Sequence, residues 1–96
     1  MVFYFINLTD PPEQITVSSK VVNVVENEIP DRITCSAKAF PEATYIWKYG
    51  EEVVSSEAVL FLGSPFQRNQ AGEYVCIALN QHGNVSISAT INVQCK

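Results

Sequence analysis

Positive charge is scarce in this 96-residue chain, which has six Lys and Arg residues against ten Asp and Glu and a net charge of −4. The basic residues are scattered along the chain and are not gathered in one segment. Nucleic acids and sulfated polysaccharides such as heparin bind clustered basic surfaces. The sequence favours neither class of partner, and we expect no nucleic-acid binding.

Residues suited to catalysis and metal binding are also few. The single histidine, His82, lies in a predicted turn, and no known signature places a Ser or Cys nucleophile near it. The three cysteines show no Cys-x-x-Cys spacing, so a zinc site is not indicated. We expect no enzyme activity, no metal and no cofactor.

Long apolar runs are absent too. No run approaches the roughly 20 apolar residues of a membrane helix. The apolar segment 2–6 has no basic stretch before it and is broken at Asn7, so it does not resemble a signal peptide. We therefore expect the chain to be part of a longer protein, with any membrane anchor outside it.

The sequence does contain many short segments with alternating apolar and polar residues, separated by turn residues. The hydrophobic content of 47% and the charged content of 17% are typical of one folded domain. No segment shows a helical stripe, so an all-β sandwich is predicted. Its expected strands are 14–18, 20–26, 32–38, 44–49, 53–55, 58–62, 73–79 and 86–93.

The first ten residues are predicted to lie outside the domain, which would span residues 11–96. Residues 2–9 are expected to form a short strand, and the pattern at 6–9 repeats that at 91–94. We interpret 1–10 as the end of a preceding domain or its linker, with Pro11 and Pro12 as a stiff hinge. A segment added for expression is the alternative.

The run from 67 to 83 carries the most specific pattern. It enters a strand after Gly72, places Tyr74 and Cys76 on one face, and ends in a polar turn; Cys35 and Trp47 lie upstream. A Cys, a Trp and then Tyr-x-Cys before a tight turn resembles an immunoglobulin domain. The resemblance covers roughly residues 11–93. It implies an immunoglobulin-like antiparallel β-sandwich of about seven strands with Greek-key connections, of the intermediate or C2 type.

The resemblance also implies roles for these residues. Cys35 and Cys76 would form a disulfide between the sheets, Trp47 would pack against it, and Tyr74 would form the tyrosine corner. Two buried thiols, as in intracellular muscle immunoglobulin domains, are the alternative for the cysteines.

Two N-glycosylation sequons, at Asn7 and Asn84, favour a secreted, oxidising setting and therefore the disulfide. Cys95 follows the last predicted strand. It is either a free thiol or the partner of a cysteine in another domain or chain.

One position departs from the family pattern. The residue six before the second cysteine is usually an Asp that pairs with an Arg or Lys, but here it is Gln70, with Arg68 two residues earlier. The salt bridge that the family forms at this position is therefore not expected here. The segment 63–66 is also one residue off the usual spacing, which predicts a bulge there.

The outward face of the predicted sheet is a candidate contact surface. With Trp47 and Cys76 inward, four apolar side chains point outward beside Ser and Thr residues of the last strand: Ile46, Val75, Ile77 and Leu79. Such a patch suits a protein contact, although outward β-branched residues also simply favour strands. A glycan on Asn84 would cover one end of this face.

The end of the motif, residues 76–83, resembles the intermediate-set domains of cell-surface adhesion and axon-guidance receptors. We therefore predict a non-catalytic extracellular domain of a multi-domain receptor. It would bind a homophilic or heterophilic protein partner or act as a spacer. The alternatives are a ligand-binding domain of a signalling receptor and an intracellular, titin-like structural domain.

Overall fold

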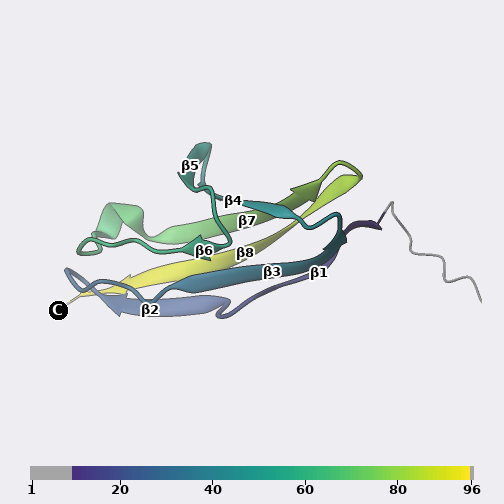
Figure 1. Cartoon of the computed structure of the whole chain (residues 1–96). Helices are drawn as coiled ribbons and strands as arrows, with labels where there is room; N and C mark the ends of the chain where they lie inside the picture. The colour runs from purple at the N-terminus through teal and green to yellow at the C-terminus, as the bar shows by residue number, and fades with distance from the viewer. Residues whose placement is uncertain (1–9, 96) are drawn as a thin grey trace, which may run out of the picture.

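The computed structural model describes residues 10–95, whose strands form two layers packed face to face (Figure 1). These residues contain no α-helix, and accordingly no helix that could cross a membrane. The elements are β1 (Asp10–Val17), β2 (Val21–Val25), β3 (Ile33–Phe40), β4 (Thr44–Tyr49), β5 (Glu52–Ser55), β6 (Val59–Leu60), the short 3-10 helix η1 (Arg68–Gln70), β7 (Gly72–Asn80) and β8 (Gly83–Gln94).

One sheet has the order β1-β3-β6 and the other the order β2-β8-β7-β4-β5. The predicted all-β sandwich is confirmed. The first strand of the domain is divided between the sheets, because β1 pairs with β3 while β2 runs along β8. This division accounts for eight strands where about seven were expected. The pairing of β2 with β8 is parallel, whereas the other pairings are antiparallel.

The first strand begins earlier than predicted. β1 starts at Asp10 and contains both prolines, of which Pro12 is buried, whereas the strand had been expected only from residue 14. β1 is an edge strand with irregular register between Asp10 and Thr16, and edge strands tolerate proline because one side of their backbone needs no ladder partner. The strand predicted at 2–9 lies outside the described residues.

The chain between β4 and β7 resolves one open assignment and corrects one prediction. The sequence leaves open which sheet the segment 53–55 joins, and β5 pairs with β4, so it extends the five-stranded sheet. β6 ends at Leu60, and the bulge predicted at 63–66 is wrong because no strand continues there. The segment instead runs as a loop that delivers the fully buried side chain of Phe66 to the core.

The core lies between the layers. Its largest fully buried side chains are Trp47, Phe66, Ile33, Leu60, Ile91, Cys35 and Cys76. The predicted alternation holds in β7, where Tyr74, Cys76 and Ala78 are buried and the residues between them are not. The prediction from alternating residues is correct here, because one face of the sheet packs on the core and the other does not.

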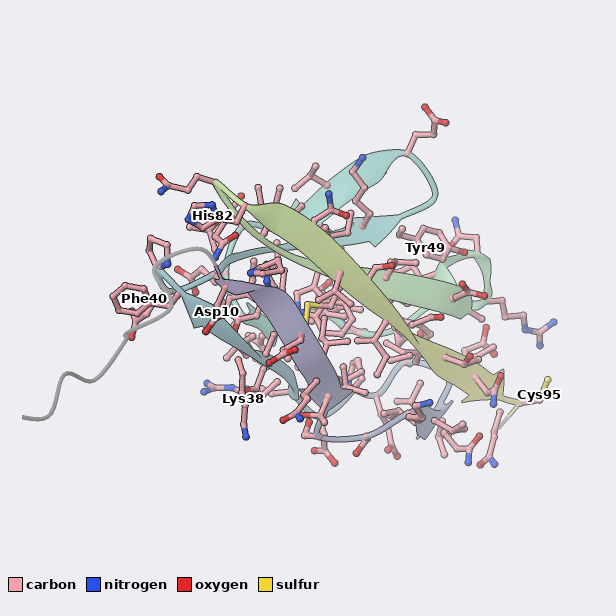
Figure 2. All side chains as sticks on the ribbon, turned by 90° about the vertical axis from the view of Figure 1, so that its right-hand side faces the viewer. Asp10, Lys38, Phe40, Tyr49, His82 and Cys95 are labelled. Atoms are coloured by element: carbon pink, nitrogen blue, oxygen red, sulfur yellow. A yellow bond between two sulfur atoms is a disulfide. The ribbon has the colours of Figure 1, made fainter. Side chains whose placement is uncertain are left out.

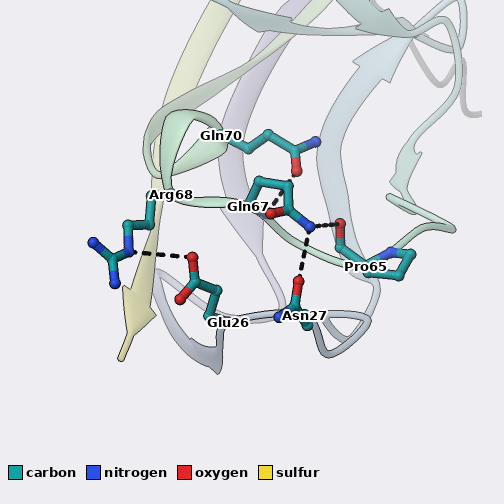
Figure 3. A network of polar contacts seen from close by, with 6 residues as sticks. All are labelled: Glu26, Asn27, Pro65, Gln67, Arg68 and Gln70. Carbon is teal, nitrogen blue, oxygen red and sulfur yellow. Dashed lines mark hydrogen bonds and ion pairs between the residues drawn. The ribbon is translucent and has the colours of Figure 1, made fainter. Parts of the chain in front are cut away.

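A polar network closes the end of the sandwich where Phe66 enters (Figure 3). The amide of Phe66 donates to the Glu28 carbonyl, and the Asn27 amide donates to the Phe66 carbonyl, each at 2.9 Å. The side-chain amide of Gln67 donates to Asn27 Oδ1 at 3.0 Å. These bonds hold the loop after β2 against the loop before η1, so the backbone around Phe66 is well fixed.

The salt bridge usual in the family does not form at Gln70, and Arg68 pairs with a different carboxylate. Arg68 Nε lies 3.1 Å from a carboxylate oxygen of Glu26, a residue just after β2 (Figure 3). Gln70 stands at the usual Asp position. Its side-chain Oε1 accepts a hydrogen bond from the backbone N–H of Gln67 at 2.8 Å. Because the Arg68 side chain is largely exposed, this ion pair contributes little to stability.

The burial of Phe66 yields a stability prediction. Phe66→Ala should lower the free energy of unfolding by about 3–5 kcal/mol, because it removes a buried ring and leaves a cavity. Phe61→Ala is the matched control: Phe61 is 51% exposed, and the Arg32 guanidinium lies over its ring, 4.9 Å from the ring centroid. The control should cost about 1 kcal/mol or less. Urea denaturation measures both, and equal losses would contradict the assignment of Phe66 to the core.

Candidate functional site: the outer face of the five-stranded sheet

A disulfide fixes the sheet that carries the candidate face. Cys35 on β3 and Cys76 on β7 come from different sheets, and the bond between them crosses the sandwich with a Cα–Cα distance of 6.5 Å. Trp47 lies opposite Cys76 in the ladder and is fully buried. Its indole N–H donates to the Ala58 carbonyl at 3.0 Å. The inward faces of β4 and β7 are thereby set, and with them the residues that point outward.

Two tyrosines close the end of the same strand pair. The Tyr74 hydroxyl donates to the Gln70 carbonyl at 2.6 Å, which is the hydrogen bond of a tyrosine corner. Tyr49 lies opposite Tyr74, and the two rings stack with centroids 4.6 Å apart. The Tyr49 hydroxyl donates to the Ala71 carbonyl at 2.6 Å. Gly72 follows with a φ of +133°, a conformation that other residues rarely adopt.

Burial raises the pKa of Tyr74 from 10 to about 12, and the neighbouring Tyr49 adds a smaller electrostatic contribution in the same direction. The charged phenolate is therefore disfavoured in the folded state relative to the unfolded chain, in which the pKa is ordinary. The resulting stability is fully present below pH 10 and is lost as the pH rises from 10 to 12.

A pH series with Tyr74→Phe tests this linkage. The free energy of unfolding of the parent should fall by about 2 kcal/mol more than that of the variant between pH 9 and pH 12. At pH 8 the variant should already be less stable by about 1 kcal/mol, because the Gln70 carbonyl loses its donor. Urea denaturation across the series measures both effects. If the free energy of unfolding changes equally with pH in the two proteins, the pKa of Tyr74 is not raised by its burial in the folded state.

Three rows of outward residues cross β4, β7 and β8. The first row runs from Val53 on β5 through Lys48 and Val75 to Ser88 on β8. The second joins Ile46, Ile77 and Ser86, and the third joins Thr44, Leu79 and Asn84. The rows thus place the apolar residues on β5, β4 and β7 beside small polar residues on β8.

The four apolar residues predicted to point outward all lie on this face. Ile46, Val75, Ile77 and Leu79 are half-buried, because neighbouring side chains on the sheet cover them in part. Val53 joins them and is half-exposed, at 50%. The sequence did not assign Val53 to this face, because it left open which sheet the segment 53–55 joins. We call Ile46, Val53, Val75, Ile77 and Leu79 the outer patch.

The remaining predicted residues lie at the two ends of the sandwich. Asn84 is exposed and lies opposite Leu79, directly after the turn between β7 and β8, so a glycan there would cover the Leu79 end of the outer patch. Asn7 lies outside the described residues. Cys95 is exposed just after β8, at the end opposite His82 (Figure 2), and forms no disulfide within residues 10–95.

Within residues 10–95, His82 contacts two neighbouring polar side chains. Its backbone N–H donates to Asn80 Oδ1 at 2.9 Å, and its ring lies 3.2 Å from the Gln81 side-chain amide. Within residues 10–95, no three His, Cys, Asp or Glu side chains lie close enough together to hold a metal ion.

The Asn80 side-chain amide also donates to the carbonyls of Asp10 and Pro41, at 2.8 and 3.0 Å. Asn80 therefore joins three chain segments at this end of the sandwich. Sequence reasoning missed this role, because these contacts link residues far apart in the chain.

A two-sheet sandwich with a buried bridge, a Trp beside it and a tyrosine corner defines the immunoglobulin-like class of domains. The sequence matches the family model described as "Immunoglobulin domain" over residues 11–80. Since this match covers more than half of the chain, the chain belongs to the immunoglobulin domain family, as the sequence motif indicated.

The sequence is also similar to segments of larger named proteins. Contactin-6 of Rattus norvegicus is 38% identical over 82 residues, which are 78% of this chain and 8% of that protein. Neural cell adhesion molecule 1 of Bos taurus is 30% identical over 101 residues, which are 93% of this chain and 12% of that protein. This chain therefore spans about a tenth of the length of these two relatives.

Among solved structures, the one titled "Sidekick-1 immunoglobulin domains 1-5" superposes with a TM-score of 0.72 at 19% identity. The match covers 92% of this chain and 21% of that chain. At this level of identity the likeness concerns the fold.

Proposed function

We propose that this chain is an extracellular, non-catalytic immunoglobulin-like domain of a multi-domain cell-surface adhesion or recognition receptor. It binds another protein through the outer patch. The observation that carries the proposal is the arrangement of that patch: five apolar side chains on three adjacent strands, with Lys48 between Val53 and Val75, bordered by the serines of β8. Apolar centres with small polar rims are typical of protein interfaces.

Two features support an extracellular location. The Cys35–Cys76 disulfide is of the kind that persists in oxidising compartments. The sequon asparagine Asn84 is exposed, as glycosylation requires. Both features weigh against the alternative of an intracellular, titin-like structural domain. The kinship with Contactin-6 and Neural cell adhesion molecule 1 supports an adhesion receptor over a signalling receptor.

Ile77→Asp tests the contact. The side chain points out of the sheet at the middle row, so the variant should keep the fold while placing a charge at the centre of the patch. Thr16→Asp on the other sheet, where Thr16 is exposed, is the matched control. Fluorescent beads coated with each protein should report bead–bead aggregation for a homophilic contact and attachment to cultured cells for a heterophilic one.

We expect Ile77→Asp to weaken association at least about tenfold, a loss of about 1.4 kcal/mol. Thr16→Asp should bind as the parent does. Equal binding by parent and Ile77→Asp in both assays, with matching melting curves, would exclude the outer patch as the contact.

Intact mass of the protein from a secretory host tests the location. Before reduction, one thiol should react with an alkylating agent, and after reduction three should react, because Cys35 and Cys76 are bridged while Cys95 is exposed. Treatment with a glycosidase should lower the mass of the protein. The Asn84→Gln variant should lose less mass than the parent, because it lacks the glycan on Asn84. Three reactive thiols without reduction, together with no glycan, would favour the intracellular structural domain.

A further inference from the structure

β2 is the last strand of the five-stranded sheet, and half of its backbone faces away from that sheet. The Lys20 carbonyl accepts from Thr90 N at 2.8 Å, and Glu26 N donates to the Gln94 carbonyl at 2.9 Å, so both groups face β8. Backbone direction alternates along a strand. The N–H and C=O groups of Val21, Asn23 and Val25 therefore point outward. Within residues 10–95, the Val25 carbonyl alone among them has a backbone partner, Glu28 N at 2.9 Å.

This edge differs from the other three edges of the sandwich, each of which is protected against pairing. β1 carries two prolines and register shifts. β5 carries the charged residue Glu52 at its start, directly after Glu51. On β6, the Val59 carbonyl already accepts a hydrogen bond from the Ser55 hydroxyl at 2.9 Å. β2 has no proline, no charged residue and no register shift. Proteins normally block an exposed edge with such features, so an unprotected β-branched edge is suited to pairing.

The sequence of β2 fits a two-fold partner. Val-Val-Asn-Val-Val reads the same in both directions about Asn23. If a second copy pairs antiparallel about this residue, Asn23 lies opposite its own copy and Val21 lies opposite Val25 of the other chain. In the hydrogen-bonded positions of an antiparallel ladder both residues exchange N–H···O bonds. The outward groups of Val21 and Asn23 and the Val25 N–H would then be paired, while the Val25 carbonyl, already bonded by Glu28 N, would accept a second bond.

The charges beside β2 favour the same orientation. Lys20 precedes the strand, while Glu28 and Asp31 follow it and line an open groove of about 180 Å³ beside its edge. An antiparallel partner brings the Lys20 end of each chain to the acidic end of the other, whereas a parallel partner would bring like charges together. The groove is open, and Ile29 at its border is 53% exposed.

We propose that this chain forms a symmetric homodimer in which the β2 strands of two copies pair antiparallel about Asn23. The five-stranded sheets of the two copies then join into one continuous sheet, a closed two-fold arrangement. This contact uses a strand edge and not the outer patch, so it does not depend on the proposed receptor function. The interface is small, and the dimer is expected to be weak.

A cysteine at the two-fold axis tests the geometry directly. Asn23→Cys, made with Cys95→Ser to remove the exposed thiol, should link two chains, because Cα atoms of a hydrogen-bonded pair lie about 5.5 Å apart, within disulfide range. Ser36→Cys in the same background is the control, since Ser36 is exposed on β3, the middle strand of the other sheet. Under air oxidation, non-reducing gels should show at least about tenfold more linked dimer for Asn23→Cys than for the control. Equal linking in both would overturn the proposal.

A charge at the axis provides the second measurement. Asn23→Lys places two lysines directly opposite each other, which destabilises a cross-strand pair. Asn92→Lys puts the same charge on the neighbouring strand β8, next to Asn23 but not at the edge. Sedimentation equilibrium of the Cys95→Ser chain should show a concentration-dependent dimer that Asn23→Lys weakens about tenfold and Asn92→Lys largely retains, with unchanged melting curves. A monomer up to about 1 mM, or a dimer that Asn23→Lys leaves intact, would refute the pairing.

Discussion

The bond between Cys35 and Cys76 is the constraint on which the rest of the sandwich depends. A domain of this size has a small core, and a covalent tie between its sheets restricts the unfolded chain. For a separation of 41 residues, loop-closure arithmetic gives about 4 kcal/mol of stabilisation. Trp47 covers the bridge from β4, and its indole reaches the Ala58 carbonyl just before β6. The disulfide joins β3 to β7, and the indole joins β4 to the residue before β6, so both contacts link the two sheets.

The two ends of the sandwich are closed by different means. At the Phe66 end, one buried ring is held by a pair of backbone bonds to the loop after β2, and two tyrosine hydroxyls satisfy carbonyls around η1. At the other end, the side chain of Asn80 satisfies carbonyls of Asp10 and Pro41. Both arrangements give backbone carbonyls at the ends of the sandwich a side-chain donor, and a compact fold needs its buried carbonyls to be paired.

The two-sheet fold and the inward faces of β7 and β8 could be predicted from the sequence. In a strand with one buried face, every second residue is apolar, and this alternation shows which residues point inward. The burial of Phe66 was not predicted, because Phe66 follows a Gly-Ser-Pro segment that has no strand or helix periodicity. Its side chain is buried because the loop packs against the core. The pairing of Arg68 with Glu26 was missed for a related reason: the two residues meet only when the ends of β2 and the loop before β7 are brought together.

The candidate face was predicted except for one residue. Ile46, Val75, Ile77 and Leu79 follow from the inward positions of Trp47 and Cys76. Val53 could not be assigned, because four residues of strand pattern do not specify which sheet they join. The early start of β1 at Asp10 was missed because proline argues against a strand in general, and only its edge position makes it tolerable.

The parallel pairing of β2 with β8 has a mechanical consequence. The described chain enters the sandwich at Asp10 and leaves it at Cys95, at opposite ends (Figures 1 and 2). Tension between these ends pulls β2 and β8 past each other along their length, so their ladder bonds share the load and do not open one after another. Even if that ladder yields, the covalent loop keeps the residues between Cys35 and Cys76 from extending. Such a domain lengthens only in part under force.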